Sequence, residues 1–197
     1  VMFSMAAQDS VRASARSVLA AAQRGDAVAQ AEIFEAHKRA VGRLALRITG
    51  DDAVVDDIVQ EVFIAAFSAL PGFRGDAKLE TWLHTITVNK ARNWFDSSRR
   101  RQHRERKAVV DARNEPDSPE ENMEAVEHRD RLYGALAQLP EKMREAFTLR
   151  AIEGLALQEA SEILGVPVST VSYRTRRAED LLCAALGLGQ RGEGRKP

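Results

Sequence analysis

The chain has 197 residues, with 29 basic and 29 acidic side chains and therefore a formal net charge of zero. This balance argues against a protein that coats nucleic acid along its whole surface, because such binding needs an excess of positive charge. A single cysteine, Cys183, excludes a disulfide framework. Aliphatic residues and alanine are abundant, and aromatic residues make up 6%. Long stretches of the sequence lack the alternation of β-branched residues that is typical of strands. The composition therefore predicts an all-α protein.

The sequence also predicts the cellular compartment of the protein and whether it binds a metal. No apolar run approaches the roughly 20 residues that span a bilayer, and the N-terminal residues lack the pattern of a cleavable signal. The four histidines show no metal-ligand spacing with Cys183. We therefore expect a cytoplasmic protein without membrane insertion, metal or cofactor.

The first half of the chain is expected to form a helical domain over residues 11–101. Asp26 is placed to cap a long helix, and Gly50 to end it in the left-handed conformation that glycine tolerates. Acidic groups at Asp51 and Asp52 suit the positive N-terminus of the following helix. The predicted helices are 11–23, 26–48, 51–70 and 79–101.

A second helical domain is expected over residues 123–187, after a flexible acidic linker over 102–122. The linker lacks helical periodicity, is rich in charge and contains Pro116 and Pro119. Two domains of roughly 80 residues each bury only a thin core, so we expect a partner to contribute to their stability. The predicted helices of the second domain are 123–138, 141–152, 157–164 and 169–186.

The second domain contains the pattern of a helix-turn-helix. Such a motif needs a short residue where the helices cross, a glycine in the turn and an apolar residue that holds the second helix, and Ser161, Gly165 and Val171 stand at those places. Ser169 or Thr170 is expected to cap the second helix. The DNA-reading face would consist of Thr170, Ser172, Tyr173, Arg174, Arg176 and Arg177. The alternative is a solvated basic helix on a plain bundle.

A second candidate site lies on the helix 79–101, which combines aromatic, amide and basic side chains. An unpaired base needs a surface for stacking and a hydrogen-bonding edge, and Trp94 and Asn89 are of these two types. Basic residues would then hold the phosphate backbone. The residues concerned are Trp82, Asn89, Lys90, Arg92, Asn93, Trp94 and Phe95. The simpler interpretation, that Trp82, Leu83 and Ile86 belong to the core, is preferred for those three.

A third candidate site is the acidic edge formed by Asp56, Asp57, Gln60 and Glu61. Asp57 and Glu61 are one helical turn apart and share a face, which would suit metal chemistry if further ligands joined them. No histidine or third carboxylate stands at ligand spacing. We therefore favour docking on a basic partner surface over a solvated helix edge.

These motifs together resemble a known family. The first half is similar to region 2, and the second half to region 4, of the extracytoplasmic-function (ECF) sigma factors of bacterial RNA polymerase. The similarity to region 2 rests on Asp56–Phe63, Phe73–Asp76, Thr81–Leu83 and Ile86–Asn89, and the similarity to region 4 on Leu139–Arg150, Gly154 and Ile163–Val171.

The resemblance implies a sigma factor that directs core polymerase to promoters and assists their melting, without enzymatic activity. The acidic edge would bind the clamp helices of the polymerase β′ subunit, and region 4 would also meet the β flap. The last helix would read the minus-thirty-five element, and a separate anti-sigma factor would regulate the chain. Residues 73–78 with Asn89 would cradle a flipped base of the minus-ten element. With the basic and amide side chains of the helix 79–101 described above, the residues expected to bind this element are Phe73, Arg74, Lys78, Asn89, Lys90, Arg92 and Asn93.

Some residues depart from the family pattern, and other functions were weighed. Ala160 and Ser161 replace a commoner Ile-Ala pair, Thr175 stands where leucine is usual, and Ser172 replaces an often basic residue. These changes leave the promoter sequence open. The alternatives are a sigma mimic that sequesters an anti-sigma factor without reading promoters, and a metal-dependent nuclease that uses the acidic pairs.

Overall fold

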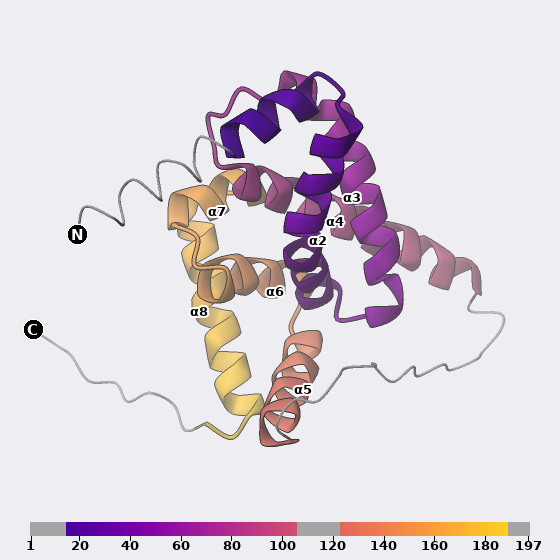
Figure 1. The fold of residues 1–197 in the computed structure, drawn as a ribbon. Coiled ribbons are helices and arrows are strands. Elements are labelled where there is room, and N and C mark those ends of the chain that lie inside the picture. Colours follow the sequence, from indigo (N-terminus) through magenta and orange to yellow (C-terminus); the bar gives the residue numbers. More distant parts are fainter. Residues whose placement is uncertain (1–14, 106–122, 189–197) are drawn as a thin grey trace, which may run out of the picture.

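The computed structural model describes residues 15–105 and 123–188, and every regular element within them is helical (Figure 1). This confirms the all-α prediction. The first half, after helical residues 15–23, consists of α2 (Ala27–Thr49), the 3-10 turn η1 (Asp52–Val54), α3 (Val55–Ala69), the 3-10 turn η2 (Leu70–Gly72) and α4 (Leu79–Glu105). The second half consists of α5 (Met123–Gln138), α6 (Glu141–Phe147), the π-helical turn η3 (Thr148–Ile152), α7 (Leu157–Leu164) and α8 (Val168–Ala185).

Several helix ends differ from those predicted. The helix α4 continues to Glu105, so residues 102–105 of the predicted linker are helical. The predicted helix 141–152 changes after Phe147 into a π-helical turn. The rest of the predicted linker, 106–122, and residues 11–14 of the first predicted domain lie outside the described residues.

The predicted caps of α2 are confirmed. The side chain of Asp26 accepts a hydrogen bond from the backbone nitrogen of Ala29 at 2.8 Å. At the other end Gly50 has φ of +71° and donates its N–H to the carbonyl of Leu46. A residue with a Cβ would be strained in this left-handed conformation, so the sequence signal for the helix end had a physical basis.

The core of the first half lies between α2, α3 and α4. Apolar residues recur on α3 at helical spacing, so one face of this helix is buried and the opposite edge stays in water. Phe63 of α3 packs edge-to-face against Phe34 of α2, with ring centroids 4.8 Å apart. The buried residues of this cluster are Val41, Ala45, Ile58, Val62, Phe63, Ala66 and Leu83.

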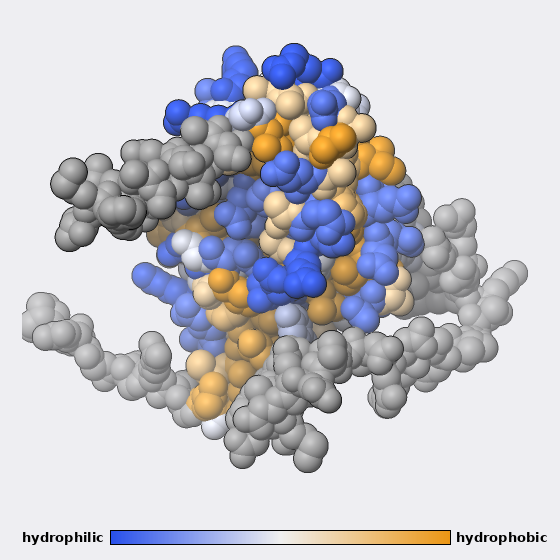
Figure 2. Space-filling view, in the orientation of Figure 1, coloured by the Kyte–Doolittle hydropathy of each residue, from blue (hydrophilic) through white to orange (hydrophobic). Residues whose placement is uncertain are grey.

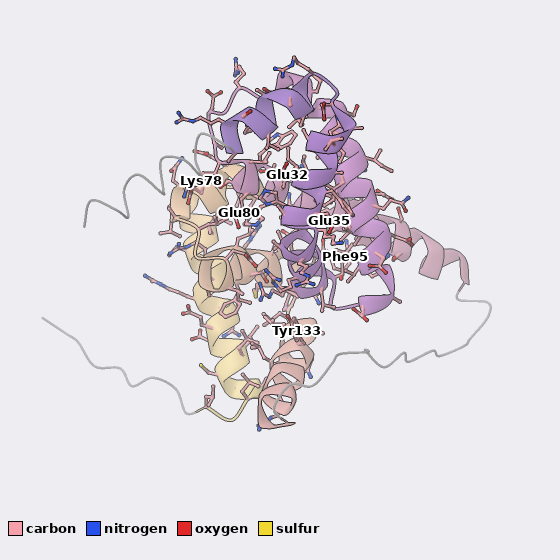
Figure 3. The ribbon with its side chains drawn as sticks, viewed as in Figure 1. Glu32, Glu35, Lys78, Glu80, Phe95 and Tyr133 are labelled. Atoms are coloured by element: carbon pink, nitrogen blue, oxygen red, sulfur yellow. The ribbon has the colours of Figure 1, made fainter. Side chains whose placement is uncertain are left out.

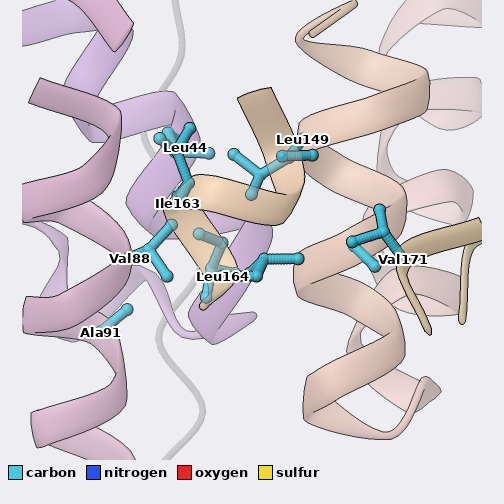
Figure 4. Close-up of a cluster of buried hydrophobic side chains, with 10 residues drawn as sticks. Leu44, Val88, Ala91, Leu149, Ile163, Leu164 and Val171 are labelled. Carbon is cyan, nitrogen blue, oxygen red and sulfur yellow. The ribbon is translucent and has the colours of Figure 1, made fainter. Parts of the chain in front are cut away.

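A second cluster joins the two halves of the chain. Val88 and Ala91 of α4 face Ile163 and Leu164 of α7 (Figure 4). The remaining buried members are Leu44, Ile48, Ala146, Leu149, Ala160 and Val171. The thin cores expected for two small domains are therefore extended by each other.

The surface over α2 mixes polar and apolar side chains (Figure 2). Hydrophobic side chains gather in the same view near the C-terminal end of α8. A third buried cluster lies beneath that end, where Leu136 and Leu139 meet Ala178 and Leu182. None of the helices in the described parts of the chain is long and apolar enough to cross a membrane.

Candidate nucleic-acid and protein interfaces

The acidic edge of α3 is a free surface. Asp56, Asp57, Gln60 and Glu61 are all exposed, because the buried stripe of the helix faces α2 and α4. Ile64 lies one turn further along and is 64% exposed. The edge thus presents carboxylates beside one apolar side chain, which is a combination suited to docking a protein.

The loop between η2 and α4 is anchored at its beginning and open at its middle. The ring of Phe73 packs on Trp82 with centroids 4.9 Å apart, and Gln23 donates a hydrogen bond to the carbonyl of Phe73 at 2.7 Å. Arg74 and Lys78 are exposed. The loop therefore holds two basic side chains in water beside a fixed aromatic pair.

The helix α4 presents two amides to solvent. Asn89 and Asn93 are both exposed and are one turn apart on the same face. Lys90 lies beside them, and its Nζ pairs with Oε2 of Glu61 at 3.1 Å. This ion pair joins the acidic edge of α3 to the face of α4 that carries the amides.

The aromatic side chains of α4 are part of the packing. Trp94 and Phe95 contact each other edge-to-face at 5.0 Å. Trp94 packs against the core of the first half and Phe95 against the cluster shared by both halves. Leu83 is buried and Trp82 and Ile86 pack against the same core, as the core interpretation of these three residues predicted. Phe73, at the start of the loop, is also half-buried.

The helix-turn-helix geometry in the second half follows the predicted pattern. Gly165 has φ of +65° at the end of α7, and Val171 is fully buried. The Ser161 hydroxyl donates to the carbonyl of Val166 at 2.6 Å, which closes the turn. Thr175 likewise donates within α8, to the carbonyl of Val171 at 2.9 Å.

The predicted cap of α8 is wrong. The residue before the helix is Pro167, no side chain caps it, and Ser169 and Thr170 lie within the first turn. Proline takes this place readily, because its fixed φ suits the start of a helix and it lacks an N–H that would need a partner.

The exposed face of α8 carries Tyr173, Arg176 and Arg177, whereas Thr170, Ser172 and Arg174 are half-buried. An open cleft of about 410 Å³ runs beside Tyr173 and Arg174 and reaches Arg99 of α4. Of the six residues predicted to read DNA, all on α8, three are thus exposed and three are half-buried.

Arg92 differs from the other basic residues of α4 in its environment. Its Nε and Nη2 each donate to an oxygen of Glu145 at 2.8 Å. Glu145 is 1% exposed, and its hydrogen bonds raise the pKa of Arg92. The side chain predicted to hold DNA is therefore held by a carboxylate of α6.

Two more arginines of the first half pair with glutamates of the second. Arg47 of α2 meets Glu153 at 2.5 Å, and Arg99 of α4 pairs with Glu141. These two glutamates and Glu145 were not among the residues predicted from the sequence. No local pattern marks them, because each lies at least 42 residues from its partner.

Two buried basic groups lie at the same boundary. Arg144 donates to the carbonyl of Thr49 at the end of α2 and stacks on Phe95, which lies where the two halves meet (Figure 3). Burial lowers the pKa of Arg144. Burial also lowers the pKa of His84, against the opposing charges of Glu153 and Glu80.

No group of three or more His, Cys, Asp or Glu side chains able to hold a metal ion is present within the described residues. The acidic edge of α3 is likewise without a further ligand there.

Comparison with known proteins identifies both halves. Residues 33–101 match the family model described as Sigma-70 region 2, and residues 129–182 match that described as Sigma-70, region 4. The ECF RNA polymerase sigma-E factor of Haemophilus influenzae is 33% identical over 168 residues, which are 81% of this chain and 88% of that protein. The sigma-E factor of Escherichia coli is 35% identical over 170 residues, 81% of this chain and 87% of that protein.

Two solved structures share the fold of this chain. The sigma factor RpoE from Bartonella quintana, in complex with the anti-sigma factor NepR, has a TM-score of 0.66 at 20% identity and covers 81% of this chain and 97% of its own. CnrH in complex with the cytosolic domain of CnrY has a TM-score of 0.64 at 27% identity, with coverages of 89% and 98%. The first of these likenesses shows the fold alone. With the relatives above, the chain belongs to the ECF family of RNA polymerase sigma factors, which direct the core enzyme to promoters.

Proposed function

We propose that three surfaces of this sigma factor divide the work of initiation. The acidic edge of α3 docks on the clamp helices of the β′ subunit of core polymerase. The loop 73–78 and the amides of α4 bind the minus-ten element, and α8 binds the minus-thirty-five element while the second half also meets the β flap. Residues 11–101 and 123–187 act as the two functional units.

The observation that carries this proposal is the accessibility of the residues concerned. Asp57, Glu61, Asn89, Asn93 and Arg176 are all exposed. Exposed amides on the helix beside a basic loop suit an unpaired base and its phosphates, and exposed arginines on a recognition helix suit base edges and phosphates. Arg92 is the exception, since it would have to leave Glu145 before it could bind DNA.

Two further assignments follow from the family. The relatives RpoE and CnrH were solved with NepR and with a domain of CnrY, so we propose that an anti-sigma factor regulates this chain as well. We also propose that the chain works in the cytoplasm beside the polymerase and catalyses no reaction itself. A sigma mimic that reads no promoter is disfavoured by the exposed basic face of α8.

The test of the minus-ten assignment uses Asn89→Ala in holoenzyme. Unpairing a base costs a few kcal/mol that the binding pocket must offset, so the variant should bind core polymerase normally and form fewer open complexes on duplex promoter. Permanganate reactivity of unpaired thymines measures the open complexes. A template with a pre-melted bubble is the matched control, because it removes the unpairing step.

Partial rescue on the bubble template supports a role of Asn89 in melting. Equal activity of the variant and the wild type on both templates would mean that Asn89 does not contact the unpaired strand.

A further inference from the structure

Gln23 connects the helical residues 15–23 to the loop 73–78 (Figure 1). Its side-chain Nε2 donates to the carbonyl of Phe73 at 2.7 Å and to the carbonyl of Leu70 at 3.3 Å. The Leu70 carbonyl also accepts from the backbone N–H of Phe73 at 3.0 Å, which closes η2. The two donor hydrogens of one amide therefore hold both the turn that ends α3 and the first residue of the loop.

The backbone that carries Gln23 is fixed by the core of the first half. Ala22, the residue before it, is 1% exposed and packs in one buried cluster with Ile33 and Leu70. Gly25, with φ of +88°, donates its N–H to the carbonyl of Ala22 at 3.0 Å and ends this helical segment. The amide of Gln23 is therefore attached to a part of the chain that cannot move independently of the core.

Both ends of the loop meet at Trp82, in the first turn of α4. The ring of Phe73 packs on Trp82 with centroids 4.9 Å apart, and the backbone N–H of Trp82 donates to the carbonyl of Lys78 at 3.0 Å. Asn89 follows seven residues after Trp82, which is about two helical turns along the same side of α4. The anchored ends of the loop and the exposed amide of Asn89 therefore lie along one side of this helix.

The middle of the loop contributes little to its own arrangement. Residues 74–78 are all exposed. The ion pair among them joins Nε of Arg74 to Oδ2 of Asp76 at 3.3 Å, and these two side chains are 85% and 79% exposed. An ion pair surrounded by water adds little to the stability of one conformation. The arrangement of the loop therefore depends on its ends, at Phe73 and at Lys78.

We propose that Gln23 is a positioning residue for minus-ten recognition, a claim that rests on the proposed role of the loop 73–78 in binding that element. Gln23 acts through the backbone of Phe73 and does not touch DNA. A site for an unpaired base discriminates best when its groups are held in place before the base enters. Without the amide, the loop adopts several arrangements and accepts more than one base.

The first measurement reports the order of the loop in the full chain without polymerase. Trypsin cleaves after Arg74 and Lys78, which are both exposed, and mass spectrometry gives the rate at each site. Gln23→Met keeps the length of the side chain but removes its donors. Because one hydrogen bond changes a local opening equilibrium roughly two- to tenfold, cleavage at these two sites should become at least threefold faster.

The matched control is Gln30→Met. The amide of Gln30 donates to the carbonyl of Ala22 at 3.2 Å, so this variant loses the same kind of hydrogen bond in the same half. The Ala22 carbonyl keeps its bond from Gly25, and Gln23 keeps both of its bonds to the loop side. Cleavage of Gln30→Met at the two loop sites should therefore stay within twofold of the wild type.

The second measurement reports base preference in holoenzyme. Random-sequence single-stranded DNA 12-mers are selected on core polymerase with each variant, with core polymerase alone as background, and are then sequenced. Gln23→Met should lower the ratio of the preferred base to the next at one position or more at least threefold, while its affinity for core polymerase stays within twofold. Gln30→Met should keep every such ratio within twofold.

Circular dichroism checks that each variant keeps its helices. If Gln23→Met does not fold, Gln23→Asn replaces it with the same thresholds, because its amide is one methylene too short to reach the Phe73 carbonyl. The proposal is overturned if cleavage of the loop is not faster, or if cleavage is faster and base preference is unchanged. A changed preference without faster cleavage also overturns it, because Gln23 would then contact DNA itself.

Failure of the underlying function gives a different result. Wild-type holoenzyme would then select no preferred base at any position, which would remove the minus-ten assignment of the loop and this proposal with it. A wild-type preference that Gln23→Met leaves intact would overturn the role of Gln23 alone.

Discussion

Gly50 is the position where one added methyl group should weaken the contact between the two halves. With φ of +71° it already stands where a Cβ costs about 1–2 kcal/mol. A Cβ there would lie 2.7 Å from Nη1 of Arg144 and 3.1 Å from Cβ of Ala137. Arg144 cannot withdraw freely, because it donates to the carbonyl of Thr49 and stacks on Phe95.

Gly50→Ala should therefore combine the left-handed cost with an overpacking cost of about 1–3 kcal/mol. The sum is roughly 2–5 kcal/mol of the free energy of unfolding. Urea denaturation followed by circular dichroism measures it. Gly25→Ala and Gly165→Ala are matched controls, because both have positive φ and neither Cβ would meet an atom within 4 Å.

Each control should lose only about 1–2 kcal/mol. The loss of unfolding free energy in Gly50→Ala should exceed that of both controls by about 1–3 kcal/mol. Equal losses at all three glycines would refute it, because Arg144 and Ala137 would then not press on this position.

Three further predictions concern the recognition helix, the acidic edge and a buried histidine. Arg176→Ala or Arg177→Ala should weaken minus-thirty-five recognition by about 1–3 kcal/mol for each lost bidentate base contact; an unchanged footprint in strength and sequence preference would reject the assigned face. Asp57→Lys should lower the affinity for core polymerase at least tenfold in a pull-down titration, whereas unchanged affinity would move the docking surface elsewhere. Because burial lowers the pKa of His84 in the folded chain, the imidazole is protonated at a higher pH in the unfolded chain, near pH 6.5, than in the folded chain. The free energy of unfolding should therefore be fully maintained above that pH and fall below it, and His84→Gln should flatten the dependence between pH 7.5 and 5.5; a parallel slope in the variant would contradict this.

Local signals in the sequence predicted the helices well because they act over a few residues. Asp26, Gly50 and Gly165 mark helix ends by their own chemistry, and each stands where predicted. The cap at Ser169 failed because Pro167 defines the start of α8 by its fixed backbone angle. A hydroxyl two residues later then falls inside the helix.

The contacts between the halves could not be predicted in the same way. Arg92 and Glu145 are 53 residues apart, and nothing near either residue indicates the other. Arg92 was therefore assigned with Lys90 and Asn93 to the nucleic-acid face from its charge alone. Its position on α4 places it toward α6 and α7, where only the three-dimensional packing shows its partner.

The central claim, that this chain directs polymerase to promoters, is tested most directly by mapping transcript starts on genomic DNA. Core polymerase is used with and without the purified chain. We expect discrete new start sites that depend on the chain and share two sequence elements upstream of the start. Binding of the chain to core polymerase without any new start site would contradict the account and would favour a sigma mimic.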